Sequence, residues 1–348
     1  MSPKSKRVAI LTGGGDCPGL NAVIRGLVRR LKPEGYTLLG LLDGWEGLLM
    51  NKTMELDFRS VSGILNVGGT ILGTSRTNVL KDETTIKKAF EQFKALDLDA
   101  LVAIGGEGTL YVTNELFKRG MPVVGVPKTI DNDINATDFT FGFNTAVEVA
   151  TQAIDRIHTT AESHKRVMVV EVMGRHAGWI AAYSGIAGGA DVILMPEHVL
   201  SFKEICAKLE KRFQRGKKFS IIVVAEGARF EKDGEEISVA KSRTDAFGRP
   251  QLGGIGQTLA NMIEDTIHIE SRVTVIGHVQ RGGTPTAQDR ILASQLASGA
   301  ADLILEEKFG QMSALRGTKI VSVPLSDATA KLKTVSEDIQ KLVENFSE

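Results

Sequence analysis

The sequence has little cysteine, few aromatic residues and no excess of either charge. Only Cys17 and Cys206 are cysteine among 348 residues, which excludes a disulfide-built scaffold. Lysine plus arginine equals aspartate plus glutamate at 42 each, so bulk charge indicates neither a nucleic-acid nor a membrane partner. No apolar run approaches the ~18 residues of a membrane span, and the one behind the basic start is too short for a signal peptide. We therefore expect a cytoplasmic protein.

Glycine, by contrast, is abundant, with 37 residues, and short apolar runs alternate with helical patterns. The apolar runs that predict strands are residues 7–12, 37–42, 100–104, 123–126, 166–172, 191–194, 220–225 and 272–276. The predicted helices are residues 19–32, 83–96, 109–119, 145–161, 202–214, 251–265, 286–307 and 328–345. Unbroken apolar strands separated by helices are typical of a parallel sheet covered on both faces. The sequence thus predicts a doubly wound α/β fold, whose ligands bind beyond the carboxyl ends of the strands.

The first predicted strand runs into a glycine-rich loop, GGGD at residues 13–16, which precedes a predicted helix. Glycine permits positive φ and close approach to the backbone. A helix that begins there directs free N–H groups and a partial positive charge at the loop, which suits a phosphate. The loop is neither a Walker sequence nor a G-x-G-x-x-G. A tight turn without a ligand explains this stretch equally well.

A second glycine loop, GGEGT at residues 105–109, follows the predicted strand 100–104. Thr109 is expected to cap the next helix. Glu107 is suited to Mg2+, which takes one or two protein carboxylates together with phosphate oxygens. The alternative is a capped turn with a solvated Glu107. Two such loops after neighbouring strands favour phosphate chemistry.

Polar residues also follow the other predicted strands. In PKTIDNDI, residues 127–134, an aspartate could accept the proton of a substrate hydroxyl during phosphoryl transfer, although aspartates are also common in plain turns. The planar guanidinium of arginine can donate two parallel hydrogen bonds to a phosphate. Arg76 ends the glycine-rich loop GGTILGTSR, where it either reaches phosphate or faces water. The remaining loops supply Arg175, Glu226, His278 and Arg281. Together they fit a kinase that acts on an already phosphorylated small molecule.

These motifs, in this order and spacing, resemble the 6-phosphofructokinase family from Arg7 to about Ala300. The motifs are GGGDCPGLNAVIRG, GGTILGTSR, GGEGT, PKTIDNDI, EVMGRHAGWIA, GGADVILMPE, AEGAR and GHVQRGGTPTAQDRILA. The resemblance implies two α/β domains: residues 1–142 with 280–330 for the phosphoryl donor, and residues 143–279 with 331–348 for the sugar phosphate. It implies a glycolytic enzyme that moves a phosphoryl group from ATP to the 1-hydroxyl of fructose 6-phosphate. It also implies a homo-oligomer, either a dimer or a tetramer.

The resemblance further implies a role for each matching position. Asp131 is the base that takes the proton from the sugar 1-hydroxyl, with Thr129 and Asp133 beside it, and Glu107 is associated with Mg2+. The residues that face the phosphoryl donor are Gly15, Arg76, Gly106, Gly108, Thr109 and Arg175. The residues that hold the sugar phosphate are Arg166, Met173, Gly174, Glu226, Arg272, His278 and Arg281. Arg166 and Arg272 are expected to reach across from a neighbouring subunit.

Residues 108 and 128 indicate different phosphoryl donors. Family members that use ATP commonly have glycine at position 108, where pyrophosphate users commonly carry aspartate, so Gly108 favours ATP. Lys128, however, is typical of pyrophosphate users. A reversible, pyrophosphate-dependent enzyme therefore remains the alternative. More distant alternatives are an NAD or diacylglycerol kinase, which the sugar-phosphate motifs argue against, and a non-catalytic sugar-phosphate-binding subunit, which the presence of Asp131 argues against.

Overall fold

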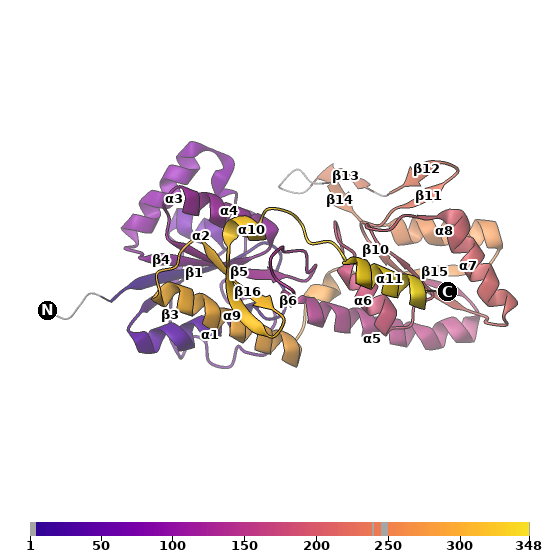
Figure 1. The fold of residues 1–348 in the computed structure, drawn as a ribbon, viewed down its shortest axis with the longest axis horizontal. Helices are drawn as coiled ribbons and strands as arrows, with labels where there is room; N and C mark the ends of the chain where they lie inside the picture. The colour runs from indigo at the N-terminus through magenta and orange to yellow at the C-terminus, as the bar shows by residue number, and fades with distance from the viewer. Residues whose placement is uncertain (1–4, 239, 245–249, 348) are drawn as a thin grey trace. The chain divides into compact units, whose positions relative to one another are not determined.

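A computed structural model describes residues 5–238, 240–244 and 250–347. The chain divides into two compact units, which we describe separately (Figure 1). Unit 1 comprises Met1–Ile130, Ile134–Thr145 and Arg281–Leu332, and unit 2 comprises Asp131–Asp133, Ala146–Gln280 and Lys333–Glu348. Each unit has a sheet rich in parallel strands together with helices, so the predicted α/β class is confirmed.

Unit 1 contains an eight-stranded sheet in the order β17-β16-β5-β4-β1-β2-β3, with β6 paired to β5. Its strands are β1 (Arg7–Gly13), β2 (Thr37–Leu41), β3 (Thr53–Leu56), β4 (Ala100–Gly105), β5 (Val123–Thr129), β6 (Phe141–Gly142), β16 (Gln311–Arg316) and β17 (Lys319–Pro324). Strands β2, β1, β4, β5 and β16 run parallel, and β3 and β17 pair antiparallel at the two edges. Residues 8–11 of β1 are fully buried, as expected for a strand covered on both faces.

The helices of unit 1 pack on both faces of its sheet: Figure 1 shows α3 and α4 on one side of the strands and α1 and α9 on the other. The helices are α1 (Leu20–Leu31), α2 (Trp45–Met50), α3 (Glu83–Ala95), α4 (Glu107–Lys118), α9 (Ala287–Leu305) and α10 (Leu325–Ala328), with short 3-10 turns at η1 (Lys32–Glu34) and η2 (Val79–Lys81).

Unit 2 is built on a four-stranded parallel sheet in the order β15-β7-β10-β8. Its strands are β7 (Val167–Val172), β8 (Val192–Leu194), β10 (Ser220–Ala225) and β15 (Ser271–Val275). Its helices are α6 (Trp179–Ala187), α7 (Phe202–Gln214), α8 (Ile255–Ile267), α11 (Glu337–Phe346), the 3-10 turn η3 (Gly277–Arg281), and α5 (Phe143–His164), whose first residues belong to unit 1. Two small sheets contain β9 (Leu200–Ser201), β11 (Phe230–Lys232), β12 (Glu235–Ile237), β13 (Ala240–Thr244) and β14 (Pro250–Leu252).

The predicted helices over residues 251–265 and 328–345 depart most from the structure. Residues 328–345 do not form one helix: α10 ends at Ala328, α11 begins at Glu337, and the chain between is mostly extended. Its backbone N–H groups bond elsewhere, that of Lys333 to the Asp133 carbonyl oxygen and that of Val335 to Glu197 Oε1. The helix predicted over 251–265 begins only at Ile255. None of the described helices is both long and apolar enough to cross a membrane.

Candidate active site

Three buried strands of unit 1 end side by side. Gly13 at the end of β1 is in register with Gly105 at the end of β4, and Gly105 is in register with Pro127 of β5. The loops at residues 13–16 and 105–108 therefore leave the sheet at the same edge as Lys128 and Thr129. The structure thus places Gly15, Gly106, Glu107, Gly108, Thr109 and Thr129 at the same edge of the unit 1 sheet.

Helix α4 begins earlier than predicted, and Thr109 is not its cap. The N-cap residue is Gly106, which offers no side chain, and Glu107 is the first helical residue. Thr109 lies in the first turn and is buried, and a methyl group at Gly13 or Gly105 would meet its side chain at under 3 Å. The correction has a physical reason, because Thr109 fills the space between the two glycine loops instead of facing the helix end.

Two cationic side chains flank the first glycine loop. Lys128, which is almost completely buried, donates a hydrogen bond from Nζ to the Gly15 carbonyl oxygen at 2.5 Å. Arg281 also packs against this loop, so closely that a methyl group at Gly15 would lie 2.5 Å from its Nη1. Gly14 in the same loop has φ +78°, a conformation that favours glycine. A loop with backbone N–H groups between two cations is suited to an anion.

The loop that ends in Arg76 is held by hydrogen bonds to the first glycine loop and to the strand and helix on either side of it. Thr74 Oγ1 donates to the Gly14 carbonyl oxygen at 2.7 Å, and Thr12 Oγ1 donates to that of Gly73 at 2.7 Å. The buried amide of Asn21 donates to the carbonyl oxygens of residues 67 and 68 and accepts from the N–H of residue 71. Arg76 itself is exposed. The loop is thereby fixed, while its terminal guanidinium remains accessible.

The segment Asp131–Asp133 is held by the chain near the C-terminus. Lys333 donates from its backbone N–H to the Asp133 carbonyl oxygen at 2.9 Å and from Nζ to Asn132 Oδ1 at 3.0 Å. Asn132 is fully buried, whereas Asp131 and Asp133 on either side are partly exposed. The two carboxylates predicted to do chemistry therefore flank an asparagine that is fixed in place.

The carboxyl edge of the unit 2 sheet collects most of the predicted sugar residues. The N–H of Glu226 bonds to the Val172 carbonyl oxygen at 2.9 Å, and the N–H of Gly227 bonds to that of Gly174 at 3.0 Å. Residues 173–175 and Glu226 therefore lie side by side. The buried Gln280 accepts from the Met173 N–H at 3.3 Å, which ties this loop to η3, where the exposed His278 lies.

Arg166 and Arg272 lie at the opposite edge of the same sheet. Arg166 directly precedes β7, and Arg272 lies at the start of β15, whereas Met173 follows the end of β7. A parallel strand of six residues such as β7 is about 17 Å long. Both arginines contact Glu270: Arg166 Nε lies 2.6 Å from Glu270 Oε2, and Arg272 Nη2 donates to Oε1. The Arg166 hydrogen bond is the main reason that the pKa of Glu270 lies below its usual value. Within one chain the structure therefore does not bring these arginines to Glu226.

Two further residues near the glycine loops, Glu107 and Cys17, are considered as a metal ligand and as a nucleophile. Among the described residues, no three His, Cys, Asp or Glu side chains form a potential metal site. A single carboxylate such as that of Glu107 would suit a metal that takes its other ligands from a bound phosphate and water. Cys17, beside the first glycine loop, is buried, and this burial raises the pKa of its thiol, which disfavours a nucleophilic role.

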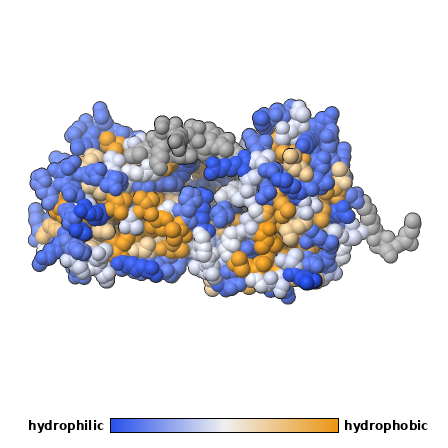
Figure 2. Space-filling model, turned by 180° about the vertical axis from the view of Figure 1, so that it is seen from behind, coloured by the Kyte–Doolittle hydropathy of each residue, from blue (hydrophilic) through white to orange (hydrophobic). Residues whose placement is uncertain are grey.

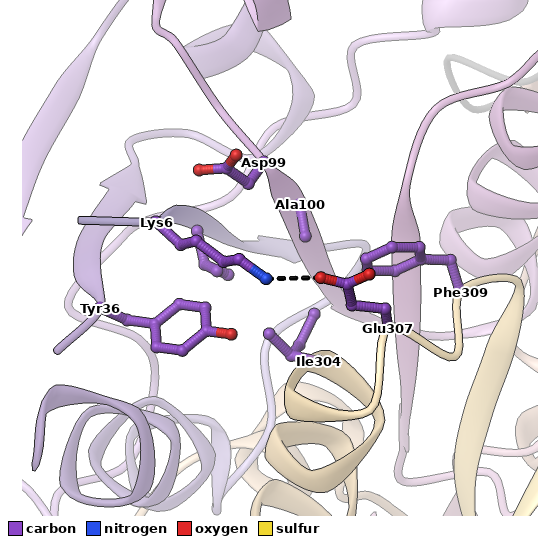
Figure 3. Close-up of a pocket in the computed structure, with 8 residues that line it drawn as sticks. Lys6, Tyr36, Asp99, Ala100, Ile304, Glu307 and Phe309 are labelled. Atoms are coloured by element: carbon purple, nitrogen blue, oxygen red, sulfur yellow. Dashed lines mark hydrogen bonds and ion pairs between the residues drawn. The ribbon is translucent and has the colours of Figure 1, made fainter. Parts of the chain in front are cut away.

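One pocket lies away from these residues. It has a volume of about 160 Å³ and lies around Lys6, Asp99 and Ala100, at the amino ends of β1 and β4 (Figure 3). An ion pair of 2.5 Å between Lys6 and Glu307 crosses it. Because the glycine loops leave the other edge of the sheet, this pocket contains none of the predicted site residues.

Sequence reasoning missed three residues that hold candidate segments in place within their own unit: Asn21 in unit 1, and Gln280 and Lys333 in unit 2. Asn21 and Gln280 are polar residues in otherwise buried positions, a signal that appears only once burial is known. Lys333 gave no signal at all, since it lies about 200 residues from its partner Asn132.

Comparison with known proteins gives consistent matches over nearly the whole chain. A family model described as Phosphofructokinase matches residues 7–304. A pyrophosphate–fructose 6-phosphate 1-phosphotransferase of Streptomyces coelicolor is 53% identical, covering 98% of this chain and 99% of that protein. An ATP-dependent 6-phosphofructokinase of Corynebacterium efficiens is 51% identical, covering 94% and 95%.

Among solved structures, the Pichia pastoris phosphofructokinase in the T-state matches with a TM-score of 0.83 at 30% identity. The match covers 99% of this chain and 37% of the Pichia chain. A pyrophosphate-dependent phosphofructokinase from Nitrosospira multiformis matches with a TM-score of 0.84 at 20% identity, covering 99% and 92%.

Proposed function

This chain belongs to the phosphofructokinase family, and from that premise we propose that it transfers a phosphoryl group from ATP to the 1-hydroxyl of fructose 6-phosphate. The product would be fructose 1,6-bisphosphate, so the step belongs to glycolysis. The observation that carries the proposal is the glycine loop at residues 13–16, held between Lys128 and Arg281 at the edge where β1, β4 and β5 end. This arrangement suits the phosphates of a donor.

Asp131 is the proposed general base. A carboxylate near the attacking hydroxyl accepts its proton as the phosphorus–oxygen bond forms, and the remaining catalysis is positioning and charge stabilisation. Thr129 and Asp133 orient this base. The charge that develops on the transferring group is stabilised by Arg76, Arg175 and the N–H of Gly15.

Mg2+ fits the donor side of this site. Glu107 would hold it as a single carboxylate at the start of α4, next to the loop that binds the donor phosphates. When bound, the ion would neutralise part of the phosphate charge.

Gly108 supports ATP as the donor. It is exposed in the first turn of α4, and a methyl group added there would find no atom within 4 Å. Glycine is a poor helix former, at a cost of about 1 kcal/mol relative to alanine. Packing therefore does not require glycine at this position, and the open space is available to the α-phosphate of a nucleotide.

Pyrophosphate is the second candidate donor, and two observations favour it. The relative from Streptomyces coelicolor at 53% identity is named as a pyrophosphate enzyme, and Lys128 offers an ammonium beside the loop. One observation weakens the second argument. Lys128 Nζ already donates to the Gly15 carbonyl oxygen, so this lysine supports a loop that would bind the phosphates of either donor.

The site is proposed to need a second copy of the chain. Arg166 and Arg272 lie at the edge of the unit 2 sheet opposite Met173 and Glu226, so one chain cannot direct all four at one sugar phosphate. Strand β15, which carries Arg272, is an edge strand, and Val275 and Val279 nearby are exposed by 59% and 67%. Figure 2 shows hydrophobic side chains gathered in patches on the surface seen there. Exposed apolar patches are common at protein interfaces.

The test is turnover of fructose 6-phosphate with Mg2+, with ATP and pyrophosphate assayed in parallel. Turnover with ATP alone supports the proposal. Turnover with pyrophosphate alone would reject ATP as donor and keep the family reaction. Absence of turnover with either donor would reject the proposed function.

A further inference from the structure

We propose that Lys333 is a positioning residue for the catalytic segment Asp131–Asp133. The proposal rests on the proposed function, because it takes Asp131 as the base. Lys333 would not touch the substrate. It would fix the backbone and the asparagine between the two aspartates, and so set the direction in which Asp131 presents its carboxylate.

The contacts between Lys333 and this segment come from both its backbone and its side chain. The N–H donates to the Asp133 carbonyl oxygen at 2.9 Å, and Nζ donates to Asn132 Oδ1 at 3.0 Å. Asn132 has φ +50°, in the left-handed region that side-chain-bearing residues rarely adopt. Asparagine enters this region more readily than most other residues, because its short side chain can form hydrogen bonds locally. The charge-assisted bond from Lys333 Nζ fixes the direction of the buried Asn132 side chain.

Lys333 is itself held from the other side by α6. Trp179, the first residue of α6, donates from Nε1 to the Lys333 carbonyl oxygen at 3.0 Å. The Lys333 ammonium lies 5.3 Å from the centre of the Trp179 ring, within the range of a cation–π contact. Glu197 accepts from the N–H groups of Gly178 and Val335, which joins the chain after Lys333 to the start of α6. Lys333 thus links the catalytic segment to a buried helix.

This link lies outside the part of the chain that the family model covers, although the relatives match nearly the whole chain. The match ends at residue 304, whereas Lys333 lies in the extended chain between α10 and α11. The family motifs therefore do not account for it, and the position of the base in this protein depends on a C-terminal segment that those motifs do not include.

The experiment compares three variants of the full-length protein. Lys333→Met removes the donor to Asn132 but keeps an apolar stem that can pack on Trp179, so the fold should be retained. Lys333→Arg keeps a cationic donor. The control, Lys331→Met, removes a lysine two residues earlier that is exposed and has no hydrogen bond or ion pair among the described residues.

We expect Lys333→Met to lower kcat by about ten- to a hundredfold, since small misplacements of catalytic groups have effects of this size. KM for both substrates should change less than about twofold, because substrate contacts are intact. Lys333→Arg should recover most of kcat, and Lys331→Met should behave as wild type. A purely structural role would lower Tm without this selective loss of kcat. Wild-type kcat in Lys333→Met would overturn the proposal.

Hydrogen–deuterium exchange supplies a readout that does not need turnover. The backbone amides of a peptide spanning residues 127–141 should exchange faster in Lys333→Met than in wild type. Their exchange rate in Lys331→Met should equal that of wild type. Equal exchange in all three proteins would overturn the proposal even if kcat fell. If wild type transferred phosphate from neither donor, the proposed function would fail, whereas faster exchange in Lys333→Met alone would still support the positioning of this segment.

Discussion

The side chain of Thr109 lies directly against Gly13, although 96 positions separate them in the chain. A methyl group at Gly13 would come within 2.6 Å of Thr109 Oγ1 and 2.8 Å of Cγ2. Gly105, in register with Gly13 on the neighbouring strand, faces the same threonine even more closely. Packing at the edge of the sheet therefore requires glycine at these two positions, whether or not the loops bind a phosphate.

The first prediction follows from this contact. Gly13→Ala should destabilise the protein by about 1–3 kcal/mol, the usual cost of overpacking, and should lower kcat/KM for the donor because the loop must shift. Chemical denaturation and steady-state kinetics measure the two effects. Adding Thr109→Ala should restore part of the stability, since both clashing atoms are removed.

Gly108→Ala is the matched control for this prediction. It adds the same methyl group in the first turn of α4, where no atom lies within 4 Å, and should leave stability unchanged or improve it by up to about 1 kcal/mol. Equal stability of the Gly13→Ala and Gly108→Ala proteins would show that the Thr109 contact does not constrain the loop.

The strands and glycine loops of the site could be predicted from the sequence because their signals are local. A strand buried on both faces is an unbroken apolar run, as residues 8–11 and 100–104 illustrate, and a glycine loop at its end is visible as letters. The parallel arrangement then places such loops at one edge. The loops at 13–16 and 105–108 follow this reasoning.

What could not be predicted depends on contacts between distant segments. The extended chain around Lys333 resembles a helix in sequence, but its N–H groups pair with Asp133 and Glu197, contacts that override local propensity. Thr109 matched a cap by residue type, yet the helix begins two residues earlier. The hairpin of β16 and β17 was not predicted either, because its burial is mixed and lacks a clean alternation.

Asp131→Ser should lower kcat by about a hundred- to ten-thousandfold, the contribution of a positioned general base. Binding of fructose 6-phosphate, measured by calorimetry, should stay within a few-fold of wild type, because the serine removes the proton acceptor without adding bulk. Asp327→Ser, in α10 of unit 1, serves as a control that removes a carboxylate from an exposed surface. Near-native turnover by Asp131→Ser would mean that another group is the base.

Gly108→Asp should abolish most turnover with ATP while leaving the fold intact. The side chain enters open space, so Tm should change little, but its bulk and negative charge would meet the α-phosphate of a nucleotide. Activity with pyrophosphate, which has no α-phosphate attached to a nucleoside, should fall less or rise. Parallel kcat/KM measurements with both donors decide this, with Gly108→Ala as the control for bulk alone. Unchanged ATP turnover would contradict the role given to this space.

Glu270→Gln should lower KM for fructose 6-phosphate by about two- to fivefold with little change in kcat. The Glu270 carboxylate occupies both Arg166 and Arg272, and a phosphate that binds these arginines must displace it. Glutamine keeps the size of the side chain but removes the negative charge. The effect should be modest because exposed ion pairs are weak, and it should shrink as salt is added.

Glu162→Gln, which neutralises an exposed glutamate on α5 that has no hydrogen bond or ion pair among the described residues, controls for the change in net charge. A lower KM in Glu270→Gln but not in Glu162→Gln would identify Glu270 as a competitor for the phosphate. A higher KM would reverse this assignment. The carboxylate would then be needed to orient the two arginines, and their disorder in Glu270→Gln would weaken phosphate binding more than the freed positive charge strengthens it.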